Sequence, residues 1–110
     1  MKEGEPVAGT MVRAITKSWD AAELVSRADP SMLKDTPETK IRGMIDACSA
    51  FAGQVRDVKG LTSQVVRSSD GSKLARYTLA ITGEKAKARV EITLQKQPSR
   101  WTVMGFWVKG

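Results

Sequence analysis

The 110-residue chain contains no histidine and only one cysteine, Cys48. The lack of histidine excludes Ser-His-Asp and Cys-His catalysis, the usual imidazole acid–base groups and most zinc and haem sites. One cysteine permits neither an internal disulfide nor a thiolate metal cluster. We therefore expect a protein that is not an enzyme, with no catalytic residue, no bound metal and no cofactor.

Long hydrophobic runs are also missing. No stretch approaches the roughly 20 apolar residues that a transmembrane helix needs, so no transmembrane segment is expected. The N-terminal residues 1–6 are polar, without the hydrophobic core of a signal peptide, and are expected to be flexible. A cytoplasmic protein and a mature exported domain both fit this pattern. The length suits one domain, spanning residues 1–110.

Acidic residues are scarce in the second half of the chain. Residues 1–52 carry 7 basic and 8 acidic side chains and residues 53–110 carry 11 and 4, giving net charges of −1 and +7. This excess of positive charge in the second half favours an anionic partner or an acidic membrane surface, or it simply keeps one face of a sheet solvated. No helix-turn-helix, zinc-finger or glycine-rich phosphate motif is present, so nucleic-acid binding is not expected.

Helical patterns fill the first half of the chain. Asp20 and Glu23 have the spacing of a capping box, and Thr36 is a good N-cap for a helix that Gly53 terminates. Pro30 disfavours helix before it and indicates a turn, followed by a short packed turn. The sequence predicts three helices, over about residues 7–18, 20–28 and 36–52.

Strand patterns fill the second half. Four strands are expected, over about residues 54–68, 73–82, 85–95 and 101–109, joined by turns at residues 69–71, 83–84 and 97–99. Gly60 suggests a bend or bulge in the first of them. Because helices precede strands, the predicted fold is α+β, with N-terminal helices packed on a curved four-stranded antiparallel sheet in the order α-α-α-β-β-β-β.

The last strand is apolar on both faces. Simple alternation puts Trp101, Val103 and Trp107 on one face and Met104, Phe106 and Val108 on the other. Such a strand needs a cover on each side, which helices, a ligand or a partner chain can supply. A bulge at Gly105 gives the alternative. Trp101 and Val103 then share a face with Phe106 and Val108, and Trp107 is the one large residue that lacks a cover.

The order of elements and a few residues suggest a family. The closing segment RWTVMGFWV, from Arg100 to Val108, together with Trp19-Asp20 and Tyr77, resembles small bacterial members, of unknown function, of the nuclear transport factor two-like, or cystatin-like, superfamily. The resemblance implies a cone in which helices close over the concave face of a curled sheet, often leaving a pocket. Enzymes of that superfamily place Asp-His or Tyr-Asp groups in the cone. A chain without histidine departs from that pattern, which puts isomerase activity in doubt.

Candidate site residues fall into two groups. Those expected at a pocket or interface are Trp19, Tyr77, Trp101, Phe106 and Trp107. Those expected to form an anion-binding patch are Lys85, Lys87 and Arg89 on one strand face, with Arg76 beside them on the neighbouring strand. Cys48 lies on the apolar stripe of its helix and is interpreted as a structural residue.

These residues predict a non-catalytic binding or protein-interaction domain. A homodimer formed through the outer sheet face is expected because Trp is enriched in interfaces and one face of the last strand lacks a cover. The alternative is a cone pocket that binds a small apolar ligand, or a degenerate isomerase-like enzyme. A third interpretation is a basic surface for anionic partners.

Overall fold

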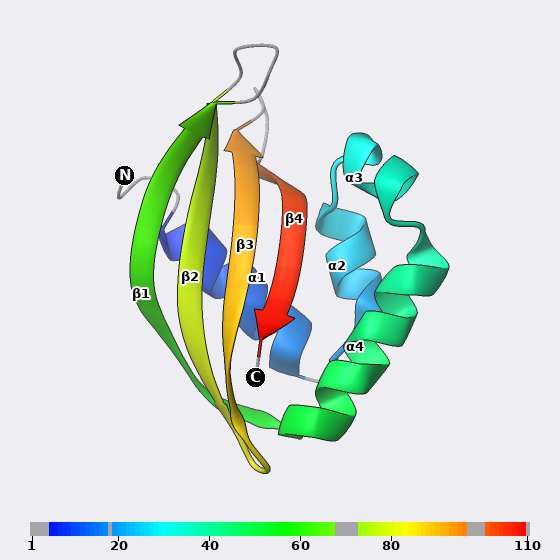
Figure 1. The fold of residues 1–110 in the computed structure, drawn as a ribbon, viewed down its shortest axis with the longest axis vertical. Helices are drawn as coiled ribbons and strands as arrows, with labels where there is room; N and C mark the ends of the chain where they lie inside the picture. The colour runs from blue at the N-terminus through cyan, green and yellow to red at the C-terminus, as the bar shows by residue number, and fades with distance from the viewer. Residues whose placement is uncertain (1–4, 18, 68–72, 97–100, 110) are drawn as a thin grey trace.

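The computed structural model describes residues 5–17, 19–67, 73–96 and 101–109, which form helices followed by an antiparallel sheet (Figure 1). The helices are α1 (Glu5–Lys17), α2 (Ala21–Arg27), α3 (Pro30–Asp35) and α4 (Glu38–Ala52). The strands are β1 (Val55–Arg67), β2 (Lys73–Gly83), β3 (Lys87–Lys96) and β4 (Trp101–Lys109), adjacent in that order. The predicted α+β class and the four-stranded antiparallel sheet are therefore confirmed.

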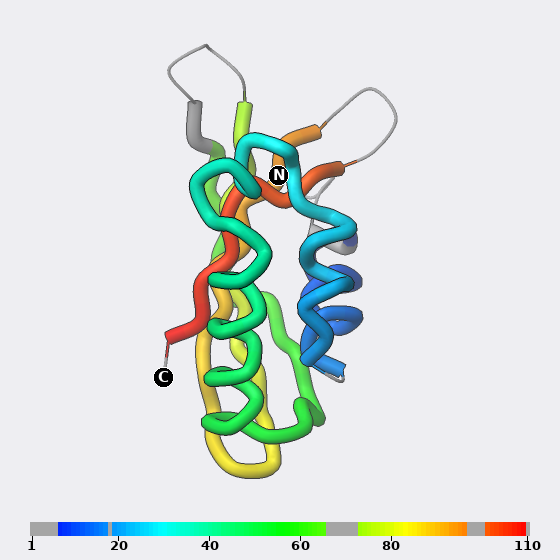
Figure 2. The backbone as a smooth tube through the Cα atoms, turned by 90° about the vertical axis from the view of Figure 1, so that its right-hand side faces the viewer, coloured from blue at the N-terminus to red at the C-terminus, as the bar shows by residue number. Residues whose placement is uncertain are grey.

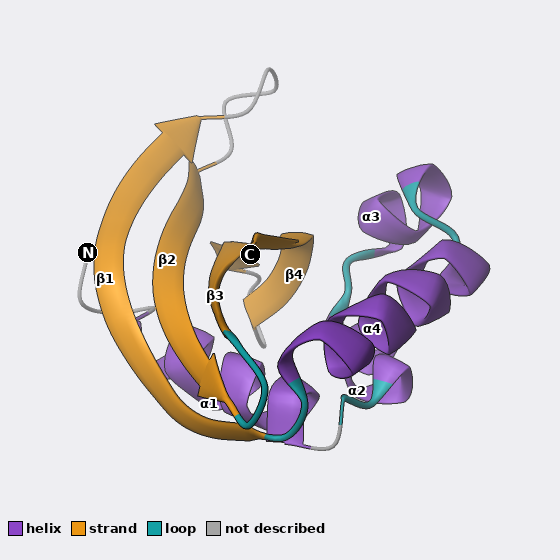
Figure 3. Cartoon of the chain, turned by 60° about the horizontal axis from the view of Figure 1, so that its bottom comes forward, coloured by secondary structure: helices purple, strands orange, loops and turns teal. Residues whose placement is uncertain are grey.

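The sheet curls, and α1 crosses its inner face (Figure 3). Figure 2 looks at the molecule from the side of α4 and shows α1 and α2 together on one side of the strands. The segment after α2 reaches the sheet edge, where the Asp29 N–H donates to the Val103 carbonyl at 2.8 Å. The helices thus cover the inner face and the β4 edge and leave the outer face of the sheet open.

The core lies between the inner face and the helices. Alternate residues of β2 and β3 are buried there, as the sequence predicts: Ala75, Tyr77, Leu79, Ile81, Ala88, Val90, Ile92 and Leu94. Helix α1 contributes Val12 and Ile15, and α4 contributes Ile41 and Ile45, all buried. Within the described residues, no helix combines the length and apolar character needed to cross a membrane.

The start of α2 matches the prediction in part. Asp20 is the N-cap, and its carboxylate accepts from the Ala22 N–H at 2.9 Å. The reciprocal half of the capping box does not form. The Asp20 N–H donates to the Ile15 carbonyl, and Glu23 turns to Arg27 at 3.2 Å. A carbonyl in the last turn of α1 therefore accepts a hydrogen bond from the residue that caps α2.

The region before α4 corrects two predictions. The expected turn at Pro30 is wrong, because Asp29 caps a six-residue helix, α3, and the proline takes its first position, where a missing N–H costs nothing. The chain therefore has four described helices where three are predicted. Helix α4 starts at Glu38, with Pro37 at the N-cap position and no side-chain cap, so Thr36 is not its N-cap.

A bulge in β4 decides which way its side chains face. Thr93 pairs with Gly105 and Leu94 with Val103, so Met104 is the extra residue. Trp101 and Val103 consequently share the inner face with Phe106 and Val108, and Trp107 lies on the outer face with 65% of its surface exposed. Simple alternation is wrong here, and the bulged alternative is confirmed.

The other strand predictions are confirmed in part. The bend expected at Gly60 is confirmed by a register shift in the β1–β2 pairing between Gly60 and Thr62. Strand β3 begins at Lys87, two residues later than expected. The predicted turns at 69–71 and 97–99 lie outside the described residues, as does most of the predicted flexible segment 1–6, of which residues 5 and 6 belong to α1.

Candidate functional site

One hollow lies on the concave side of the sheet, between α1 and the strands β1 and β2. Its volume is about 430 Å³. Helix α1 contributes Ala8, Gly9 and Arg13, while β1 contributes residues 58 and 60–63 and β2 residues 77–79. We call this hollow the concave pocket.

Local sequence explains why the concave pocket is open. Ala8 and Gly9 are the smallest residues available, so α1 leaves space above the sheet. On β1, Ser63 lies opposite Tyr77, and the register shift at Leu61 turns this apolar side chain partly into solvent. Tyr77 is 3% exposed, so it forms part of the floor. The pocket therefore has an apolar floor and a rim with hydroxyl groups.

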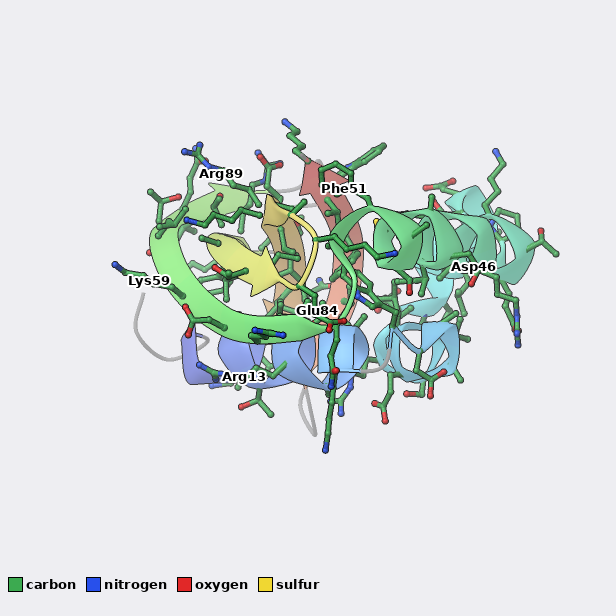
Figure 4. All side chains as sticks on the ribbon, turned by 90° about the horizontal axis from the view of Figure 1, so that it is seen from below. Arg13, Asp46, Phe51, Lys59, Glu84 and Arg89 are labelled. Atoms are coloured by element: carbon green, nitrogen blue, oxygen red, sulfur yellow. The ribbon has the colours of Figure 1, made fainter. Side chains whose placement is uncertain are left out.

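Arg13 supplies the charge of the concave pocket. Its Nη2 donates to the Val58 carbonyl at 3.4 Å, and the same side chain lines a neighbouring hollow of about 240 Å³. Figure 4 labels Arg13 on α1, below the sheet. The described lining contains no carboxylate, so a ligand there would meet one cation, hydroxyl groups and apolar carbon.

A second hollow, of about 380 Å³, lies between β4 and the helices α3 and α4. Three methionines line it, Met32, Met44 and Met104, together with Phe106 and Trp107. Methionine is adaptable and is common at surfaces that accept varied apolar partners. Two of the five predicted pocket or interface residues, Phe106 and Trp107, thus line the same hollow, although they lie on opposite faces of β4.

Two predicted site residues belong to the core instead. Trp19 is 7% exposed, and its Nε1 donates to the Gly53 carbonyl at 2.7 Å. Trp101 packs partly buried against the core, with the Lys96 ammonium 5.9 Å from its ring centre. Neither lines the hollows described above. The five predicted residues therefore do not form one site.

Three of the four residues of the predicted anion patch, Arg76, Lys87 and Arg89, share the outer face of the sheet. Lys85 lies in the turn before β3, and Arg76 pairs with Thr93, four residues along β3 from Arg89. The cations that accompany Arg89 are Lys59 and Lys109, through the pairings Lys59–Ala80, Ala80–Arg89 and Arg89–Lys109. These two lysines were missed because only the register of the whole sheet places them beside Arg89.

Arg13 was also missed. It occupies an exposed position between the apolar residues of α1, which from sequence alone is typical of a solvated helix face. The sequence signal that could have indicated Arg13 is Gly60. A bulge beside this glycine bends β1 and opens the space that Arg13 borders.

Cys48 is half-buried on α4, and burial raises the pKa of its thiol. Since the thiolate is the reactive form, we expect Cys48 to react with a disulfide reagent more slowly in the folded than in the urea-unfolded protein. The folded rate should still be rising at a pH where the unfolded rate has levelled off. Stopped-flow absorbance measures both. Equal rates in the two states would contradict a structural role for this thiol.

The described residues contain no group of three acidic, cysteine or histidine side chains placed to hold a metal ion. No protein-family model matches the chain, and no curated protein sequence matches it.

Proposed function

We propose that this domain is a non-catalytic binding domain whose concave pocket holds a small anionic ligand with an apolar part. The observation that carries the proposal is a pocket of about 430 Å³ bordered by Arg13 over an apolar floor. Ligand sites typically occupy roughly 300–1,000 Å³ and combine apolar walls with a few polar groups. Arginine suits a carboxylate or sulfonate because its fork of donors matches their paired oxygens.

The lining also supports a non-catalytic role. General acid–base chemistry usually needs a histidine or a carboxylate at the reacting group. The chain has no histidine, and the described lining has no carboxylate. A curled sheet with a helix across its concave face is also in line with the cone of the nuclear transport factor two-like superfamily, so membership of it remains part of this proposal.

Dimerisation through the outer sheet face stays a prediction with one observation in its favour, the 65% exposure of Trp107. A two-fold interface would bring the same surface of two copies together. That surface carries Lys59, Lys87 and Arg89, and like charges brought together oppose association. We therefore place ligand binding ahead of self-association.

The pocket can be probed with 8-anilinonaphthalene-1-sulfonate, which joins an anionic group to aromatic rings. Its fluorescence should rise on binding to the folded protein. Arg13→Gln should weaken binding about tenfold, because a charge-assisted hydrogen bond contributes roughly 1.5–3 kcal/mol. Ser63→Trp should abolish binding, since the new ring fills the pocket from β1.

The matched control is Gln64→Trp, which places the same ring on the next residue of β1, facing the other side of the sheet. This variant should bind the dye as the unmodified protein does. If Ser63→Trp bound the dye as tightly as Gln64→Trp, the dye would occupy another place and the proposed function would fail.

A further inference from the structure

The outer face of the sheet is basic and has no covering helix. Five cations project from it, Lys59, Arg76, Lys87, Arg89 and Lys109, against two acids, Asp57 and Glu91. Glu91 forms an ion pair with Lys109, with 3.6 Å between the carboxylate Oε1 and the ammonium Nζ. The other four cations form no ion pair within the described residues. We call these five cations the outer basic patch.

The sheet register makes the outer basic patch two-dimensional. Lys59, Arg89 and Lys109 occupy one row across the four strands, with Ala80 between the first two. Lys87 lies one row to one side, and Arg76 lies two rows to the other. Strands are about 4.8 Å apart and rows about 6.8 Å apart, so the patch covers about 14 by 20 Å.

Two aromatic side chains accompany the outer basic patch. Trp107 lies on the same face, one row along from Arg89 and Lys109, and is 65% exposed. Phe51, at the end of α4, is 50% exposed. Figure 4 shows Phe51 and Arg89 on the same side of the molecule and Arg13 on the opposite side. A large apolar side chain left in water beside unpaired cations suggests a partner that is both anionic and apolar.

We propose that the outer basic patch docks the domain on the surface of an anionic lipid bilayer, with the Trp107 ring at the interface. A bilayer surface is a plane of anionic headgroups above apolar carbon, and it matches a two-dimensional patch with an exposed indole. A single-stranded nucleic acid needs a linear track with several stacking rings, whereas this sheet face offers one. The sheet curls around α1, so its outer face is convex and α1 does not cover it (Figure 3).

The electrostatic contribution of the outer basic patch to membrane binding is tested by sedimentation with phosphatidylcholine vesicles, with and without phosphatidylserine. The protein should bind only the anionic vesicles, and less tightly as salt rises. The double variant Lys59→Gln/Arg89→Gln should bind about 25-fold more weakly, at about fivefold per cation near the surface. The control Lys17→Gln/Lys34→Gln removes the same charge from exposed positions on α1 and α3 and should lose less than about threefold.

The apolar part is tested by fluorescence. Vesicles with brominated acyl chains should quench the tryptophan emission of the wild type, and Trp107→Phe should lose most of this quenching because Trp19 and Trp101 pack against the core. These variants change exposed side chains, and a circular-dichroism melt checks that each is folded. Absent binding, equal losses in the two double variants, or tighter binding to a single-stranded oligonucleotide through the same residues would each overturn the proposal.

Discussion

Replacing Gly83 with alanine is expected to lower the free energy of unfolding by about 3 kcal/mol. A Cβ built at Gly83 overlaps the Ala52 carbonyl oxygen and falls 2.9 Å from the Ala52 carbonyl carbon. Both atoms are backbone, so no rotamer change relieves the overlap. The same oxygen accepts the Lys85 N–H at 2.9 Å. The last turn of α4 and the end of β2 must therefore separate, and this hydrogen bond is strained or lost.

Urea unfolding followed by circular dichroism measures the effect, which corresponds to a melting temperature lower by about 15 °C. The matched control is Gly43→Ala on α4, where an added Cβ has no atom within 4 Å. Because alanine favours helix over glycine, this control should raise the free energy of unfolding by about 0.5–1 kcal/mol. Equal midpoints for Gly83→Ala and the wild type would contradict the close approach of α4 to β2.

Local signals predict much of the fold. The alternation in β2 and β3 is regular enough to place Tyr77 and Ile92 on the inner face, because period two over many residues fits only a strand with one buried face. Gly53 ends α4 as expected, at φ 71°, a backbone conformation that glycine adopts at no steric cost. These features depend on neighbours in sequence, so the sequence alone carries them.

Features that depend on distant contacts are harder to predict. Pro30 is equally consistent with a turn and with the first residue of a helix, and the pairing of Asp29 with β4 accompanies the helix. From the sequence alone, the bulge at Met104 is one of two possible registers for β4, and only the pairing with β3 decides between them. Lys59 and Arg89 come together through β2, and Arg13 borders a pocket only because α1 lies over β1. Each of these needs the assembled sheet.

Replacing Trp19 with phenylalanine is expected to lower the free energy of unfolding by about 2–3 kcal/mol. The change removes the indole donor, so the Gly53 carbonyl loses its 2.7 Å partner, and it also removes buried volume. Trp19 has a φ of 49°, a conformation that costs a bulky residue energy. Burial and the hydrogen bond to Gly53 offset that cost. Trp19→Ala, which gives up more buried surface, should cost about 3–5 kcal/mol.

The same substitution at Trp107 is the control, because this side chain is largely exposed and Trp107→Phe should change the free energy of unfolding by less than about 0.5 kcal/mol. Urea midpoints of the two variants separate a structural tryptophan from a surface one. Similar losses would mean that Trp107 is buried and would remove the anchor of the outer basic patch. A large loss at Trp19 alone agrees with a molecule whose stability depends on the junction of α1, α2 and α4.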